Sequence, residues 1–165
     1  MCLSDGERVD PVMTKIDSWE DVNKMEMIDP SVVKPFVSES LSIVRKEVSP
    51  EPEVFGFVGC PYTLATYLIE GKSSKDFKNT KKMMVNDPKL MHVILNNVAS
   101  NIGDYTNFQI ESGAQVMQIF DSWAGALSTL DYATFAQPYQ EMVRLLTTYE
   151  HSDDPPGVRR RGRRL

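Results

Sequence analysis

Polar side chains that could bind a ligand follow two short apolar segments of this 165-residue chain. Asp121 and Ser122 come directly after residues 114–120 (AQVMQIF), and Tyr67 follows residues 54–59 (VFGFVG). Hydroxyl and carboxylate groups placed at strand ends can hold a polar substrate through hydrogen bonds. Position alone also allows structural roles: Ser122 can cap a turn, Tyr67 can pack with its hydroxyl at the rim, and Asp121 can brace the strand end.

Metal, thiol and phosphate chemistry have little support in the sequence. Cys2 and Cys60 are the only cysteines, and two cysteines cannot form a structural zinc site or a disulfide scaffold. Cys60 has no neighbouring base, so we expect its thiol to pack without reacting. The glycines form no Gly-x-Gly-x-x-Gly pattern that would cradle a phosphate. We therefore predict no metal site and no nucleotide site.

Charge is divided unevenly between the body of the chain and its end. The net charge is −5, but five arginines lie among the last seven residues, which leaves 13 basic against 23 acidic residues elsewhere. A body this acidic does not predict a nucleic-acid-binding surface. Residues 149–165 lack hydrophobic periodicity and are predicted to be a disordered Arg-rich tail. One interpretation of this tail is a nucleic-acid or localisation patch. The interpretation that we favour is read-through past a mis-spliced or mis-predicted exon.

No segment is predicted to enter or cross a membrane. No apolar stretch approaches the roughly 20 residues that span a bilayer. The first residues, MCLSDGERVD, have neither the basic start nor the apolar core of a secretory signal. The low cysteine content fits a reducing compartment.

Hydrophobic spacing and capping residues predict an α/β chain. Proline follows aspartate at Asp29 and Asp87, which is typical of helix starts, while Gly71 and Gly113 are expected to end helices. Residues 1–28 are polar and are expected to be irregular. The predicted helices cover residues 30–48 (restarting at Pro35, with one buried face), 61–70, 73–84, 88–112 and 128–146, and the predicted strands cover residues 54–59 and 114–120.

The order of these elements predicts a parallel sheet, because a long helical crossover joins the two strands. Two parallel strands alone cannot cover their edges or bury both faces. A complete (β/α)₈ barrel needs about 250 residues. Residues 1–148 are therefore expected to form one part of a larger α/β domain.

Two long, ordered motifs resemble the uroporphyrinogen decarboxylase family of haem and chlorophyll biosynthesis. They are GFVGCPYTLATYLIEGKSSKDF (56–77) and GAQVMQIFDSWAGALS (113–128), supported by PFVSESLSIVRKEV (35–48) and FAQPYQEMV (135–143). The resemblance runs from about residue 10 to about residue 148. It implies an incomplete TIM (β/α)₈ barrel, a homodimer in the full-length family, and no metal or organic cofactor. The cytoplasm is the expected location, with the plastid as the alternative.

The same resemblance implies a decarboxylase that removes CO₂ from the acetate side chains of uroporphyrinogen to give coproporphyrinogen. In that family a pyrrole is thought to be protonated, CO₂ leaves, and the methylene is reprotonated. An aspartate in the cleft stabilises the positive charge that develops, and arginines pair with the substrate carboxylates.

Only part of the family's site falls on this chain. By the resemblance, Tyr67 and Ser122 contact substrate, and Asp121 supports them without touching substrate. The arginine-rich segment and the strand with the catalytic aspartate are expected before this chain begins, and a histidine segment after it ends. His92 lies on a predicted helix and His151 in the tail, so neither is assigned that role. We therefore predict no catalytic residue here and doubt that the chain is active alone.

Two alternatives remain open. One is a methyltransferase of the same barrel superfamily, which would transfer a methyl group from a corrinoid to a thiol with the help of zinc. The sequence offers no plausible set of His and Cys ligands for that zinc. The other is a non-catalytic truncated product that associates with full-length subunits through exposed strand edges.

Overall fold

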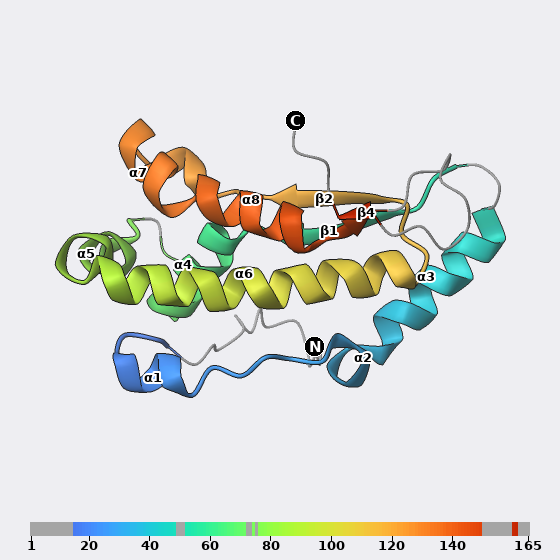
Figure 1. Cartoon of the computed structure of the whole chain (residues 1–165), viewed down its shortest axis with the longest axis horizontal. Helices are drawn as coiled ribbons and strands as arrows, with labels where there is room; N and C mark the ends of the chain where they lie inside the picture. The colour runs from blue at the N-terminus through green and yellow to red at the C-terminus, as the bar shows by residue number, and fades with distance from the viewer. Residues whose placement is uncertain (1–14, 49–51, 72–73, 75, 150–159, 162–165) are drawn as a thin grey trace, which may run out of the picture.

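The computed structural model describes residues 15–48, 52–71, 74, 76–149 and 160–161. Helices flank two paired parallel strands, and a second pair of two-residue strands lies near the end of the chain (Figure 1). The elements are α1 (Trp19–Asn23), α2 (Pro30–Val33), α3 (Pro35–Val48), β1 (Phe55–Gly59), α4 (Pro61–Glu70), α5 (Lys78–Asn86), α6 (Pro88–Glu111), β2 (Val116–Phe120), η1 (Ala124–Ala126), α7 (Thr129–Phe135), α8 (Gln137–Leu146), β3 (Thr148–Tyr149) and β4 (Arg160–Arg161).

The two main strands form the predicted parallel sheet. In the register of β1 and β2, Phe55 lies opposite Val116 and Gly59 opposite Phe120. Helices α4, α5 and α6 make the crossover between them. Both strands run toward the end of the molecule where α4 and α7 lie (Figure 1). The prediction of an α/β segment with two parallel strands and flanking helices is confirmed.

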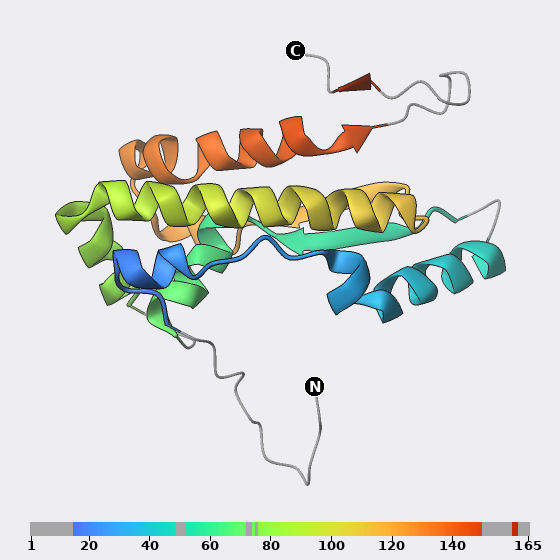
Figure 2. The same ribbon diagram turned by 60° about the horizontal axis from the view of Figure 1, so that its bottom comes forward.

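Helix α6 is the centre of the fold. The Asp87 side chain accepts a hydrogen bond from the Leu90 N–H at 3.0 Å and caps the first turn, as the sequence predicted. In the view of Figure 2, α6 lies between α8 and β1. Its inward side chains are almost fully buried against α4, α8 and the sheet. They include Leu90, Met91, Ile94, Leu95, Val98, Ala99 and Ile102.

The sheet is covered on one face only. Gly56 and Val58 point toward the helices and are buried. The alternate side chains point the other way, and Phe55, Phe57 and Phe120 are 61%, 68% and 50% exposed. Phe57 and Phe120 contact each other edge to face, with ring centroids 6.5 Å apart. Among the described residues, nothing covers this aromatic face.

A side chain from α6 protects the outer edge of β1. The buried Gln109 amide donates to the Phe57 carbonyl at 3.1 Å and accepts from the Phe57 N–H at 3.2 Å. The neighbouring residues of β1 bond toward β2, since Val54 accepts from Gln115 and Cys60 donates to Phe120. Gln109 therefore supplies the two hydrogen bonds that a further strand would make with Phe57.

The N-terminal segment is more ordered than the expected irregular chain. Ser18 and Asp21 form a reciprocal capping box at the start of α1. Ile16 and Val22 are buried, and the Ile28 N–H donates to the Asn101 side chain at 2.8 Å. The prediction that residues 15–28 are irregular was wrong, because the capping box and a few apolar contacts suffice to order the short helix α1. Residues 1–14 lie outside the described residues.

Two predicted helix boundaries were wrong. The helix expected from Ser73 begins at Lys78, because Phe77 takes a left-handed conformation (φ 51°) that interrupts the helical path. The helix expected over 128–146 divides at Ala136 into α7 and α8. Pro138 in the first turn of α8 has no N–H to bond back to α7, which explains the break. By contrast, α4 ends at Gly71 (φ 71°), as predicted.

Helix α3 lacks the buried face that its apolar spacing predicted. None of its residues is buried, and Ile43 and Val44 are 53% and 46% exposed. Both views show α3 extending away from the end of α6 (Figures 1 and 2). Of the predicted stripe, Val37, Leu41 and Val48 are half-buried and Val44 is exposed, so α6 and α2 cover the stripe only in part.

The end of the chain is described only in part. Thr148–Tyr149 (β3) pairs antiparallel with Arg160–Arg161 (β4), and the other residues of the predicted tail, 150–159 and 162–165, lie outside the described residues. The disorder predicted for 149–165 therefore stays a prediction. No helix in the part of the chain that is described is long and apolar enough to span a membrane.

Candidate functional site

The predicted site residues lie on the segments that follow the carboxyl ends of β1 and β2. The Cys60 N–H, after β1, donates to the Phe120 carbonyl at 2.7 Å, which aligns the two strand ends. The chain then enters α4 from β1, and passes through Asp121 and Ser122 into η1 from β2. Ligands commonly bind at the carboxyl ends of parallel strands, where loops leave the sheet.

Tyr67 and Ser122 lie close to the same aromatic ring. The half-buried Tyr67 ring packs edge to face on the Trp123 indole, with centroids 6.0 Å apart. Ser122 directly precedes Trp123 and is exposed. Neither the Tyr67 nor the Ser122 hydroxyl makes a hydrogen bond within the described part of the chain. Tyr67 thus contacts the residue that follows Ser122, and both hydroxyls are without a partner among the described residues.

Trp123 adds a third unused donor to this group. Its indole Nε1 is buried and has no hydrogen-bond partner among the described residues. The buried Phe77 ring packs against the indole at a centroid distance of 4.9 Å. A buried N–H without a partner is costly, so it is commonly completed by water or a ligand.

Both carboxylate oxygens of Asp121 accept a hydrogen bond from a neighbouring helix. The Thr63 hydroxyl donates to one oxygen at 2.7 Å, and the Gln140 amide donates to the other at 2.6 Å. The Trp123 N–H in turn donates to the Thr63 hydroxyl at 3.2 Å. Asp121 therefore ties the end of β2 to α4 and α8, and its supporting role toward Tyr67 and Ser122 stays a prediction.

Cys60 is a neutral, buried thiol beside this carboxylate. It is 3% exposed, and burial, with a smaller contribution from the negative charge of Asp121, raises its pKa to about 12. A thiol with so high a pKa holds almost no thiolate at neutral pH and is a poor nucleophile. This agrees with the predicted packing role.

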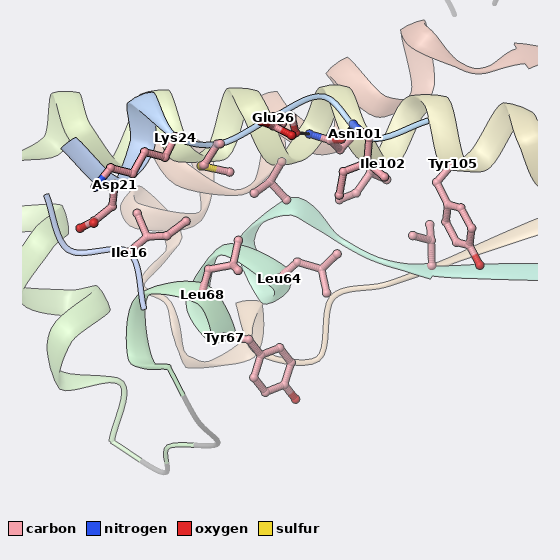
Figure 3. Close-up of a pocket in the computed structure, with 14 residues that line it drawn as sticks. Ile16, Asp21, Lys24, Glu26, Leu64, Tyr67, Leu68, Asn101, Ile102 and Tyr105 are labelled. Carbon is pink, nitrogen blue, oxygen red and sulfur yellow. Dashed lines mark hydrogen bonds between the residues drawn. The ribbon is translucent and has the colours of Figure 1, made fainter. Parts of the chain in front are cut away.

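A cavity of about 740 Å³ adjoins the site on the helical side. Its walls are mostly apolar and come from the N-terminal segment, β1, α4 and α6 (Figure 3). Three of its polar side chains already have partners, since Asp21 bonds to Ser18, Lys24 to Glu20, and Asn101 to the Ile28 N–H. In Figure 3, Tyr67 extends from α4 away from Asn101.

The sequence analysis missed three contributors to this site: Thr63, Trp123 and Gln140. Thr63 and Trp123 lie in the two long motifs and Gln140 in a supporting stretch, but none of the three was given a role in the site. Their roles depend on contacts between distant positions, since Thr63 and Asp121 are 58 residues apart. Among the described residues, no group of three or more His, Cys, Asp or Glu side chains could hold a metal ion.

Comparison with protein families gives one match over most of the chain. The model of the family described as "Uroporphyrinogen decarboxylase (URO-D)" matches residues 1–153. The uroporphyrinogen decarboxylase of Parasynechococcus marenigrum is 49% identical over 140 residues, which cover 85% of this chain and 40% of that protein. The Synechocystis enzyme is 46% identical over 152 residues, covering 92% and 43%. The chain thus spans about two fifths of the length of these curated relatives.

A solved structure shares the fold. A methyltransferase from Methanosarcina mazei aligns with a TM-score of 0.64 over 74% of this chain and 36% of its own. The sequences are 22% identical in this alignment, so the likeness concerns the fold alone.

Proposed function

We infer the function of this chain from one premise: it belongs to the uroporphyrinogen decarboxylase family, whose model matches residues 1–153. We propose that it is part of an enzyme that converts uroporphyrinogen to coproporphyrinogen by removing CO₂ from acetate side chains. Tyr67 and Ser122 contact the substrate in this proposal, and no residue of the chain is assigned as catalytic.

The observation that carries this proposal is a set of unused donors on the segments that follow the two strands. The Tyr67 hydroxyl on α4, the Ser122 hydroxyl after β2 and the buried Trp123 indole N–H have no partner among the described residues, and the Tyr67 ring packs on the Trp123 indole. Uroporphyrinogen carries many carboxylate groups, which accept hydrogen bonds from such donors. Both oxygens of Asp121 accept a hydrogen bond within the chain, from Thr63 and Gln140, so we assign Asp121 no contact with these carboxylates.

We further propose that the sheet belongs to a (β/α)₈ barrel. In such a barrel, helices cover the outer face of the strands and the inner face fills the lumen. The helix-covered face and the bare aromatic face of β1 and β2 fit this arrangement. The proposal also includes the homodimer, the absence of a cofactor, a cytoplasmic location with the plastid as the alternative, and no nucleic-acid or membrane partner.

A chimaera tests the activity. Residues 10–148 of this chain replace the matching segment of the Parasynechococcus marenigrum enzyme, and coproporphyrin fluorescence after oxidation measures turnover. We expect the chimaera to turn over uroporphyrinogen and the isolated 165-residue chain to show no conversion. In the chimaera, Tyr67→Phe and Ser122→Ala should each raise KM about tenfold, the effect of one lost hydrogen bond.

Matched controls separate binding from general damage. Tyr105→Phe removes a hydroxyl that faces the same cavity from α6, and Ser100→Ala removes one that bonds only to the Asn96 carbonyl. Both should leave KM unchanged. A folded chimaera that fails to convert uroporphyrinogen would contradict the activity, and an unchanged KM in both Tyr67→Phe and Ser122→Ala would contradict the site.

A second candidate function is non-catalytic association with full-length subunits. The bare face with Phe55, Phe57 and Phe120 favours it, because exposed aromatic surface of this kind promotes association. Sedimentation of the chain mixed with the full-length relative tests this candidate. Co-sedimentation that is lost in Phe57→Lys would support it, and separate boundaries at every concentration would exclude it.

A further inference from the structure

One chain of hydrogen bonds runs from α7 to the turn that carries Ser122. The Tyr132 hydroxyl donates to the Gln140 side-chain oxygen at 2.8 Å, and the Gln140 amide donates to Asp121 at 2.6 Å. On the other side of Asp121, the Thr63 hydroxyl donates to the carboxylate and accepts from the Trp123 N–H. The bonds converge on Asp121, which accepts one hydrogen bond at each oxygen, while Gln140 and Thr63 each donate to Asp121 and accept from a further group.

Hydrogen bonds hold the turn on both sides of Ser122. Asp121 is held through its side chain, Trp123 through its backbone N–H, and the preceding Phe120 carbonyl by the Cys60 N–H. Ser122 lies between these anchors with an exposed hydroxyl that bonds to no described residue. The turn is therefore fixed while the Ser122 hydroxyl is left free.

We propose that Gln140 is a positioning residue for substrate binding, which acts through Asp121 to fix the turn that presents Ser122. The role needs an amide, because Gln140 must accept from Tyr132 and donate to Asp121 at the same time. A glutamate of the same shape would keep the first bond and set a second carboxylate against Asp121. This inference rests on the proposed function only for the identity of the ligand.

The first test measures the turn without any ligand. Amide hydrogen exchange by NMR on the 165-residue chain gives the protection factor of the Trp123 N–H in the wild type, Gln140→Leu and Gln140→Glu. We expect protection to fall about tenfold in both variants at pH 7, the effect of one lost hydrogen bond. Core amides of α6, such as Ile94 and Leu95, should keep their protection. Gln137→Leu, on the same helix but exposed, should change neither.

Acidification distinguishes positioning from packing. Two carboxylates in contact share a proton once the pH falls, so the Gln140→Glu variant regains a donor to Asp121 below about pH 5. Asp121 lies near two other ionisable groups, Cys60 and Tyr62, and burial raises their pKa values to about 12, so both stay neutral over this range. Trp123 protection should therefore recover at low pH in Gln140→Glu and stay low in Gln140→Leu. Unchanged protection in both variants, or equal loss throughout α6, would overturn the proposal.

The second test asks whether Gln140 acts through Ser122. In the active chimaera, Gln140→Leu should raise KM about as much as Ser122→Ala, and the double variant should be no worse than either. Additive effects would show that Gln140 affects binding by another route and would overturn the positioning role. Because the exchange test uses no substrate, a wrong substrate assignment and a wrong network give different results.

Discussion

The two faces of the β1–β2 sheet differ in almost every physical respect. Toward the helices, Gly56 and Val58 are buried beneath α6, whose Leu95 is fully buried. On the opposite face, Phe57 and Phe120 are mostly exposed and touch only each other as rings. The covered face is packed like a protein interior. The bare face carries large aromatic side chains of the kind found in interiors, but they are exposed.

This difference shows which part of the fold this chain specifies by itself. Burial of α6 against α4, α8 and the sheet gives a core that does not depend on the bare face. The bare face and α3 both expose apolar residues that the described residues do not fully cover. Substitutions should therefore have unequal effects on the two faces.

The largest difference is expected between Leu95→Ala and Phe57→Ala. Leu95 is fully buried, so its truncation should lower the free energy of unfolding by about 2–5 kcal/mol. Phe57 is 68% exposed and loses mainly its contact with Phe120, so its truncation should cost about 1 kcal/mol or less. Urea unfolding of the 165-residue chain measures both. Equal losses would mean that the bare face is covered in solution.

The next effect in size concerns the close approach of helix and strand at Gly56. A Cβ at this position would lie 2.9 Å from the Gln109 Oε1 and 3.0 Å from the Ala114 Cβ, in addition to a clash with Met117. Gly56→Ala should therefore cost about 1–3 kcal/mol through overpacking. Gly125→Ala is the matched control, because nothing lies within 4 Å of its added Cβ. Two equally stable variants would show that the covered face is loosely packed.

The edge of β1 should be more tolerant than its covered face. Gln109→Leu removes both hydrogen bonds to Phe57 and should cost about 1–2 kcal/mol, since a buried backbone pair loses its partners. An edge opened in this way can pair with another chain. Sedimentation velocity should therefore show more self-association than in the wild type. A variant that is less stable yet remains monomeric would show that Gln109 stabilises the edge of β1 but does not prevent it from pairing with another chain.

Sequence patterns predicted the elements whose signals are local. Asp87 and Gly71 mark the boundaries of α6 and α4 through caps and a left-handed turn, which a few adjacent residues determine. The buried face of α3 was wrong because apolar spacing shows which residues could be buried, whereas burial needs a covering element. Gln140 was missed because its bond to Asp121 crosses 19 residues and depends on the break before α8.

The last prediction is a loss of stability at high pH that arises from two buried groups on the covered side, Cys60 and Tyr62. Burial raises the pKa values of Cys60 and Tyr62 to about 12, from ordinary values of 9.0 and 10.0. The unfolded chain therefore ionises these groups at lower pH than the folded chain does. Their contribution to stability is complete below about pH 9 and is lost as the pH rises toward 12.

Urea midpoints measured from pH 7 to pH 11 test this dependence. The wild type should lose stability above about pH 9, and Cys60→Ala should lose less, because one of the two groups no longer ionises on unfolding. Ser100→Ala is the control, since it removes a hydroxyl that bonds to the Asn96 carbonyl and changes no ionisable group. Exclusion of water on the covered side thus disfavours ionisation of Cys60 and Tyr62. The same exclusion of water is why truncation of Leu95 should lower the free energy of unfolding. A midpoint that is flat to pH 11 in the wild type would mean that water reaches Cys60 and Tyr62, and the contrast between the two faces would weaken accordingly.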